Sequence, residues 1–156
     1  MELIALFPGS FDPFTLGHLA VAELGLEMFD GLLVGIGVNA SKQGLLDPER
    51  RAELIREVFT GEPRVEVVLY EGLTGDLCRE RSIRHILRGL RNSTDFEYER
   101  DMEMANAMVF PELSTVAIFT PAEFIPVSSR LVREIITMGG DPAKFLPRGI
   151  DIKKYL

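Results

Sequence analysis

The chain contains a single cysteine, Cys78, two histidines and no tryptophan among its 156 residues. One cysteine cannot form an intramolecular disulfide, and this set is too small for a cysteine-rich zinc site, so we expect no metal ligated by a protein cluster. No apolar run approaches the roughly 20 residues that a membrane-spanning helix needs. The first residues carry no basic leader and too short an apolar run for a signal peptide. We therefore expect a cytoplasmic protein without a membrane partner.

Basic residues are also scarce relative to acidic ones, with 17 Lys and Arg against 24 Asp and Glu and a net charge of −7. This balance argues against broad binding to the phosphates of a nucleic acid, but it leaves room for a local basic pocket for a small anion. Hydrophobic residues make up 46% and charged residues 26% of the chain. These proportions and the length predict one globular domain, residues 1–156, with a core of its own.

Apolar runs alternate with longer amphipathic stretches along the chain. We expect strands at residues 3–7, 32–38, 65–69, 85–87 and 115–119, and helices at about 17–29, 48–59, 74–81, 94–108 and 128–138. Thr94 to Glu97 has the spacing of a capping box and predicts the start of the fourth helix. This alternation is typical of an α/β fold, a Rossmann-like, doubly wound five-stranded parallel sheet with helices on both faces. Ligands bind such sheets beyond the carboxyl ends of the strands, so the loops there are the candidates for chemistry.

The junction after the first strand is the strongest candidate. Gly9 lets the main chain approach a ligand closely, and Ser10 supplies a hydroxyl. Gly17 and His18 fall at a helix start, where free N–H groups and the helix dipole favour phosphate. An isolated histidine is more often structural. Here two prolines, two glycines, a hydroxyl and a histidine share one junction, which favours function.

Later loops add further cations and hydroxyls. Lys42 follows the second strand, where either an anion-binding or a solvated side chain is reasonable. Arg88 and Arg91 follow the fourth strand and suit bidentate phosphate contacts, although Asp95 and Glu99 could pair with them instead or orient them. After the fifth strand, Ser128 and Ser129 are either ordinary helix caps or part of a polyphosphate site.

One motif in the second strand is misleading. Residues 35–40 match the G-x-G-x-x-A dinucleotide fingerprint. Both glycines fall inside the expected strand, and no helix is expected to begin at Ala40. We therefore reject the fingerprint and interpret the small residues as a requirement of close strand packing.

The combined motifs resemble a known family. Gly9-Ser10-Phe11-Asp12-Pro13 with Thr15-x-Gly17-His18 is similar to the signature of the nucleotidyltransferase superfamily that is named for its HIGH-type motif. The chain further resembles the bacterial phosphopantetheine adenylyltransferases in Lys42, Arg88 to Arg91, Asp95 to Glu99, Asn106, Ser128 and Ser129. The resemblance extends over nearly the whole chain.

This resemblance implies a single nucleotidyltransferase domain that moves AMP from ATP to 4′-phosphopantetheine, giving dephospho-CoA and pyrophosphate in coenzyme A biosynthesis. It also implies Mg²⁺ as cofactor and a homohexamer, with no nucleic-acid partner. A sister nucleotidyltransferase acting on another phosphorylated acceptor is the alternative within the superfamily. A nucleotide-binding regulatory protein without turnover is the alternative outside it.

The resemblance also assigns residues to roles. His18, Ser10 and Lys42 are the expected catalytic residues, with His18 stabilising the phosphoryl group during transfer. The acceptor is expected to contact Ser10, Lys42, Thr74 and Arg88. The residues expected to bind ATP are Ser10, Phe11, His18, Gly89, Leu90, Arg91, Glu99, Phe124, Ile125, Pro126, Val127, Ser128, Ser129 and Arg130.

The chain departs from the family pattern at a few positions. Ser10 stands for the usual threonine and keeps its hydroxyl. A phenylalanine usually sits near Leu46, and the family pattern around Thr74 is usually more apolar. Arg130 replaces a serine, and we expect it to contact the β- or γ-phosphate of ATP. The alternative is an outward Arg130 that pairs with Glu134, one turn along the helix.

Overall fold

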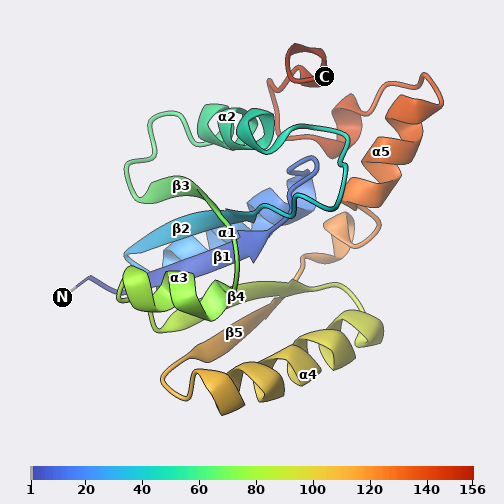
Figure 1. Cartoon of the computed structure of the whole chain (residues 1–156). Coiled ribbons are helices and arrows are strands. Elements are labelled where there is room, and N and C mark those ends of the chain that lie inside the picture. Colours follow the sequence, from blue (N-terminus) through green and yellow to red (C-terminus); the bar gives the residue numbers. More distant parts are fainter. Residues whose placement is uncertain (1) are drawn as a thin grey trace.

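The computed structural model describes residues 2–156, which form one wholly parallel sheet flanked by helices (Figure 1). The strands are β1 (Ile4–Gly9), β2 (Gly31–Gly37), β3 (Val65–Tyr70), β4 (His85–Leu90) and β5 (Ser114–Phe119), and their order is β3-β2-β1-β4-β5. The helices are α1 (Leu16–Met28), α2 (Pro48–Val58), α3 (Thr74–Glu80), α4 (Ser93–Val109) and α5 (Ser129–Thr137), and short 3₁₀ turns follow at Ala143–Phe145 and Ile152–Lys154. The predicted α/β architecture is confirmed.

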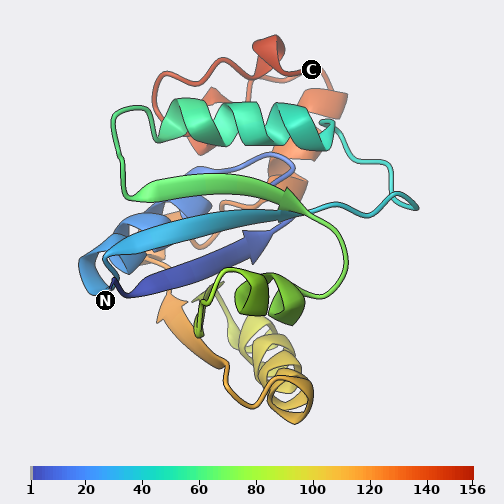
Figure 2. The ribbon, with the colours of Figure 1, turned by 60° about the vertical axis from the view of Figure 1, so that its left-hand side comes forward.

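Helices cover both faces of the sheet, as expected for a doubly wound fold (Figure 2). Successive side chains of β1 point to opposite faces. Ala5 and Phe7 join a core beneath α1, α2 and α5, while Leu6 joins a second core that includes Leu77 and Cys78 of α3 and Phe110 just after α4. No helix within residues 2–156 has both the length and the apolar character needed to cross a bilayer.

The sheet opens between β1 and β4, where the strand order reverses. Ala5 and Leu6 of β1 pair with His85 and Ile86 of β4, but the two strands have no further paired residues. On its other side β1 stays paired with β2 as far as Gly9. The gap therefore lies at the carboxyl ends of the two central strands, the usual ligand position in such folds.

Three sequence-based boundaries need correction. The fourth strand was expected to end at Leu87, but β4 continues to Leu90, so Arg88 lies within the strand and only Arg91 follows it. β1 continues through Pro8 and Gly9 instead of ending at Phe7. Proline is tolerated here because β4 no longer pairs on that side, so the missing N–H removes no bond to that strand. The predicted capping box at Thr94 is wrong, since the side chain of Asn92 caps α4 by accepting a bond from the N–H of Asp95 at 2.9 Å. Asn92 lies two residues before Thr94, and its side-chain oxygen is an equally suitable acceptor for a helix cap.

The rejected dinucleotide fingerprint is explained by packing. Gly35 and Gly37 both lie within β2. A Cβ on Gly35 would lie 2.9 Å from the Leu6 side chain and 3.1 Å from the Tyr70 ring. The absent side chain thus lets Tyr70 lie against the strand, as the sequence interpretation predicts.

Candidate active site

Two adjoining cavities lie at the carboxyl ends of β1 and β4. The first, which we call the arginine cavity, has a volume of about 370 Å³. Four arginines line it, together with His18 and the start of α5: Arg88, Arg91, Arg130 and Arg133. Only two carboxylates, Asp95 and Glu99, share that lining. The acidic chain thus has a locally cationic pocket, as the sequence allowed.

The second cavity, which we call the wide cavity, has a volume of about 820 Å³. Lys42 and Arg88 provide cations, and much of the remaining wall is less polar, as at Leu73, Met102 and Phe110. Ser10, Arg88 and Glu99 line both cavities. The two spaces therefore meet at the junction after β1.

Most of the predicted site residues lie in these cavities. The arginine cavity contains Ser10, Phe11, His18, Arg88, Gly89, Arg91, Glu99, Val127, Ser128, Ser129 and Arg130, and the wide cavity contains Lys42 and Thr74. Four predicted residues line neither of them: Leu90, Phe124, Ile125 and Pro126. The side chain of Leu90 is buried at the end of β4, while the other three lie on the loop before α5, whose carbonyl at Phe124 faces Gly17.

His18 is held in one orientation by the start of α1. The Thr15 backbone N–H donates to Nδ1 of His18 at 3.0 Å, and the Thr15 hydroxyl in turn accepts from the His18 N–H. A backbone N–H can only donate, so Nδ1 must be the acceptor and the neutral ring must carry its proton on Nε2. Nε2 has no hydrogen-bond partner within residues 2–156 and remains a free donor.

The surroundings of His18 keep its ring neutral. Burial, and then the positive charges of Arg88 and Arg91, lower the pKa of His18 from 6.5 to about 3. The rings of Phe11 and Phe14 lie 5.0 and 5.3 Å from the imidazole, between ring centroids. These aromatic neighbours exclude water, and the charged form loses its hydration.

Phe11 reaches this position through an uncommon backbone conformation. Its φ is +48°, in the left-handed region that costs energy for a bulky residue. Its ring is almost fully buried, and a Cβ on Gly9 would meet that ring at 2.8 Å. Gly9 is therefore needed to accommodate Phe11; the predicted approach of its backbone to a ligand stays a prediction.

Arg88 crosses the gap between β4 and β1. Its Nη1 donates to the Pro8 carbonyl at 2.6 Å, while Nε and Nη2 form a bidentate pair with Glu99 of α4 at 2.9 and 2.7 Å. Such a fork-to-fork pair fixes the plane of the guanidinium. The predicted acid partner is thus confirmed, and it orients Arg88 at the wall shared by the cavities.

Arg91 has a similar acidic partner. The Asp95 carboxylate accepts from both the backbone N–H and Nε of Arg91, at 3.0 and 3.1 Å. Asp95 is itself fixed at the capped start of α4. The arginine side chain is 36% exposed, so solvent screens the pair, and its effect is mainly one of orientation.

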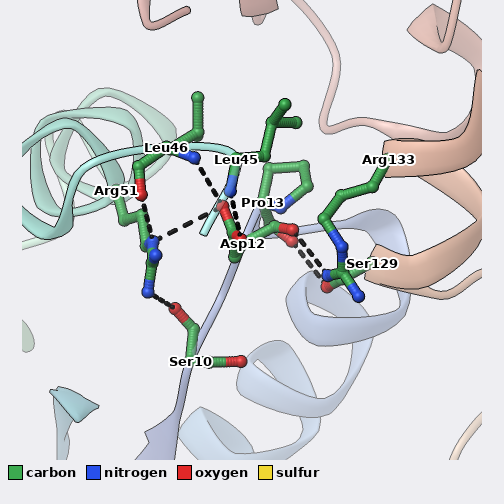
Figure 3. Close-up of polar contacts among 8 residues, drawn as sticks. All are labelled: Ser10, Asp12, Pro13, Leu45, Leu46, Arg51, Ser129 and Arg133. Atoms are coloured by element: carbon green, nitrogen blue, oxygen red, sulfur yellow. Dashed lines mark hydrogen bonds and ion pairs between the residues drawn. The ribbon is translucent and has the colours of Figure 1, made fainter. Parts of the chain in front are cut away.

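Asp12 ties the loop after β1 to the loop after β2 (Figure 3). Its two carboxylate oxygens accept from the N–H groups of Leu45 and Leu46, both at 2.8 Å, and lie 3.5 Å from Arg51 at the nearest. Arg51 donates from Nε to the Leu46 carbonyl and from Nη1 to the Ser10 carbonyl. The contacts thereby fix Ser10 relative to the segment that carries Lys42.

Helix α5 closes the arginine cavity. Ser128 is a helix cap, since its hydroxyl accepts from the Leu131 N–H at 3.1 Å, and the Ser129 hydroxyl donates to the Pro13 carbonyl at 2.8 Å. Arg130 pairs with Glu134 at 3.3 Å and its side chain is 82% exposed, which is the outward alternative. Contact of Arg130 with a phosphate stays a prediction that this geometry does not favour.

The remaining departures from the family pattern fall in different environments. The Leu46 side chain is buried in the core and lines neither of the two cavities. Thr74 lies in the wide cavity, and its hydroxyl is 2.9 Å from the Tyr70 hydroxyl. One of these two hydroxyls uses its hydrogen in the shared bond, so the other can donate to a ligand.

Sequence reasoning missed Arg51 and Arg133. Arg51 precedes Ile55, a buried residue of α2, by four residues, so helical spacing could have placed Arg51 on the same inward side. Arg133 follows Ser129 by the same spacing on α5. In the sequence Asp12 stood out only as a member of the Gly9 to Pro13 motif, because the residues that bind its carboxylate lie more than thirty positions away.

The depressed pKa of His18 predicts how this residue responds to pH. In a His85→Asn variant, where His18 gives the remaining imidazole signals, we expect nitrogen NMR shifts to report the Nε2-protonated neutral ring unchanged from pH 8 to pH 5. The unfolded chain takes up this proton near pH 6.5, so the folded state should lose stability as the pH falls from there toward 3. A His18 titration centred near pH 6.5 would contradict the burial argument.

The sequence and the fold each match known proteins. Residues 6–135 match the cytidylyltransferase-like family. A phosphopantetheine adenylyltransferase from Flavobacterium johnsoniae is 41% identical over 150 residues, covering 96% of this chain and 98% of the relative. One from Leuconostoc citreum is 47% identical over 146 residues, covering 93% and 92%.

Solved structures agree on the fold. A bifunctional NMN adenylyltransferase/ADP ribose pyrophosphatase from Francisella tularensis has a TM-score of 0.72 at 18% identity, over 98% of this chain and 47% of that one. A putative nicotinate-nucleotide adenylyltransferase from Vibrio parahaemolyticus has a TM-score of 0.65 at 19% identity, over 94% of each chain. From its sequence relatives, the chain belongs to the cytidylyltransferase-like family and, within it, to the phosphopantetheine adenylyltransferases.

Proposed function

We propose that the protein transfers the adenylyl group of ATP to 4′-phosphopantetheine, releasing pyrophosphate and dephospho-CoA. The observation that carries this proposal is the meeting of two cavities at Ser10 and Arg88, one rich in arginine and one wide with a partly apolar wall. A triphosphate suits the first cavity. A phosphate on a long, partly apolar arm suits the second, with its phosphate near Lys42 and Arg88.

The proposed reaction is an in-line displacement at phosphorus. An oxygen of the acceptor phosphate attacks the α-phosphorus of ATP, a new P–O bond forms, and the bond to the β-phosphate oxygen breaks as pyrophosphate leaves. The attacking group is already anionic, so the protein needs no nucleophile of its own. Positioning and charge stabilisation then supply most of the catalysis.

His18 is the proposed stabiliser of the transferring group. Its Nδ1 is occupied by Thr15, so the free Nε2–H is available to donate to an α-phosphoryl oxygen. The neutral ring donates this bond without first having to gain a proton. A fixed donor that meets developing charge lowers the barrier because it needs no reorganisation.

Mg²⁺ is proposed to arrive with ATP as part of the substrate. Residues 2–156 contain no cluster of three metal-ligating side chains, and Asp95 and Glu99 are both engaged by arginines. Magnesium commonly uses phosphate oxygens and water for most of its ligands, which fits this arrangement. The ion would supply charge neutralisation on the phosphates.

The identity of the acceptor is tested by measuring pyrophosphate release with a panel of phosphorylated compounds. Pyrophosphate release should be fast with ATP and 4′-phosphopantetheine and slow with nicotinamide mononucleotide, nicotinate mononucleotide or glycerol 3-phosphate. Replacing ATP by CTP should also slow the reaction. Equal or faster turnover of another acceptor would support a sister transferase, and nucleotide binding without pyrophosphate release would support a regulatory protein.

Removing the His18 ring should affect the chemical step. We expect His18→Ala to lower kcat by roughly 10²–10³-fold while the dissociation constant for ATP changes little, because the donor acts mainly on developing charge. His85→Ala is the matched control, since His85 lies in β4 beside Phe29 and lines neither cavity. Near-normal turnover by a folded His18→Ala variant would exclude the assigned role.

We also propose a homo-oligomer, a hexamer as the family resemblance implies. Helix α4 has no buried residue, and Met108 on α4 and Phe119 on β5 are 86% and 83% exposed. Light scattering after gel filtration should give a mass near six times 17.4 kDa, and Phe119→Asp should shift the protein toward smaller species. A wild-type mass of 17.4 kDa would overturn this proposal.

A further inference from the structure

Ser10 and Lys42 are both assigned to the acceptor, yet they come from different loops. Strand β1 pairs with β2 only as far as Gly9, so the sheet does not connect the loops that follow the two strands. Lys42 is exposed, and within residues 2–156 its segment, residues 39–44, forms only local hydrogen bonds, such as the one from the Lys42 N–H to the Asn39 carbonyl at 3.0 Å. The separation of Ser10 from Lys42 is therefore set by contacts further along the chain.

Arg51 of α2 supplies contacts to both loops (Figure 3). Its Nε donates to the Leu46 carbonyl at 2.8 Å, and its Nη1 donates to the Ser10 carbonyl at 3.2 Å. Leu46 follows Lys42 by four residues. A guanidinium is planar and its donors point in fixed directions. One rigid group thus sets where Ser10 stands relative to the segment that carries Lys42.

The charge of Arg51 is met by the protein itself. Asp12 lies 3.5 Å from Arg51 at the nearest, and both side chains are less than a tenth exposed. Buried charges of this kind are paired with each other and not with an incoming ligand. What Arg51 contributes to the site is therefore geometric: it holds two carbonyls in place.

The other side of the loop after β1 is held independently of Arg51. The Asp12 carbonyl accepts from Arg133 and the Pro13 carbonyl from Ser129, each at 2.8 Å (Figure 3). Both donors belong to α5, at the arginine cavity. Loss of Arg51 should therefore displace the acceptor side of the loop and leave the nucleotide side braced.

We propose that Arg51 is a positioning residue for the acceptor phosphate, which it serves by holding Ser10 and Lys42 at the separation at which both can bind one phosphate. The identity of that acceptor rests on the proposed function. Arg51 acts through the two carbonyls and contacts neither substrate. A reacting group displaced by about 1 Å can lower the rate about 10²-fold, so this geometry matters for the attack on phosphorus.

Arg51→Lys tests the proposal, because lysine keeps a charge opposite Asp12 but lacks the planar fork that reaches both carbonyls. With 4′-phosphopantetheine varied at saturating ATP, we expect kcat/KM for the acceptor to fall by up to about 10²-fold, with a raised KM. The dissociation constant for ATP, measured by calorimetry, should stay unchanged. This split distinguishes positioning of the acceptor from a general loss of structure.

A double-mutant cycle shows whether Arg51 acts through Lys42. Arg51→Lys and Lys42→Ala are measured singly and together. Residues that act as a unit give combined effects smaller than the product of the separate ones. We therefore expect Arg51→Lys to cost much less in the Lys42→Ala protein than in the wild type.

Gly44→Ala provides a second variant that changes no charge. An added Cβ would lie 2.6 Å from the Asp12 carboxylate and would also contact the Arg51 guanidinium, while the Gly44 backbone lies outside the left-handed region and accepts alanine. It should reproduce the acceptor-specific loss. Arg56→Gln is the matched control: Arg56 also lies on α2 and donates to a backbone carbonyl, that of Val67, but it lines neither cavity. Its kinetics should match the wild type.

Other outcomes would overturn the inference. If Arg51→Lys weakens ATP binding as much as it raises the KM for the acceptor, or lowers only the melting temperature, Arg51 merely stabilises the fold. If the effects of Arg51→Lys and Lys42→Ala multiply fully, Arg51 does not act through Lys42. Unchanged acceptor kinetics in both Arg51→Lys and Gly44→Ala would also exclude the role. The proposed function fails separately, when the wild-type protein binds ATP but releases no pyrophosphate with 4′-phosphopantetheine.

Discussion

The buried ion pair between Asp12 and Arg51 is the contact on which the geometry of the site depends. Both side chains are less than a tenth exposed, so the pair would be costly without further bonds. Two backbone N–H groups donate hydrogen bonds to the carboxylate, and two backbone carbonyls accept hydrogen bonds from the guanidinium. Removing one partner of such a pair typically costs about 3–5 kcal/mol, because a buried charge is left alone. Gly44 makes the arrangement possible, since a Cβ there would lie 2.1 Å from Arg51. The pair thereby holds together two loops that the sheet itself does not connect.

The other arginines of the site are likewise held in place by paired carboxylates. Glu99 and Asp95 set the orientation of Arg88 and Arg91, so these side chains need little rearrangement before they meet a ligand. Both arginines also help to keep His18 neutral, although burial of its ring has the larger effect. The outcome is a histidine that donates from a fixed nitrogen beside fixed positive charges. Such preorganisation is what phosphoryl transfer requires of a protein that supplies no nucleophile.

The relation between sequence and site differs from residue to residue. His18 was found because helix start, glycine and histidine are neighbours along the chain. The pairing of Arg88 and Arg91 with acids was anticipated as an alternative, because these residues lie within about one to three helical turns of each other. Arg51 and Arg133 were missed, since their partners in the loop after β1 are 41 and 121 residues away. Contacts of that length depend on how α2 and α5 pack on the sheet.

The sequence by itself determined the alternation of strands and helices, the parallel sheet and the junction that carries Ser10 and His18. Local patterns suffice there, because hydrophobic periodicity and turn residues act over a few positions. Only the tertiary structure decided which nitrogen of His18 is free, where the sheet opens, and which arginine of α5 contacts the loop after β1. The last point turns on a single helical turn: Arg130 and Arg133 are three residues apart, yet packing of α5 against the loop directs one outward and the other inward. Helix orientation is set by the whole core, and no short stretch of sequence contains it.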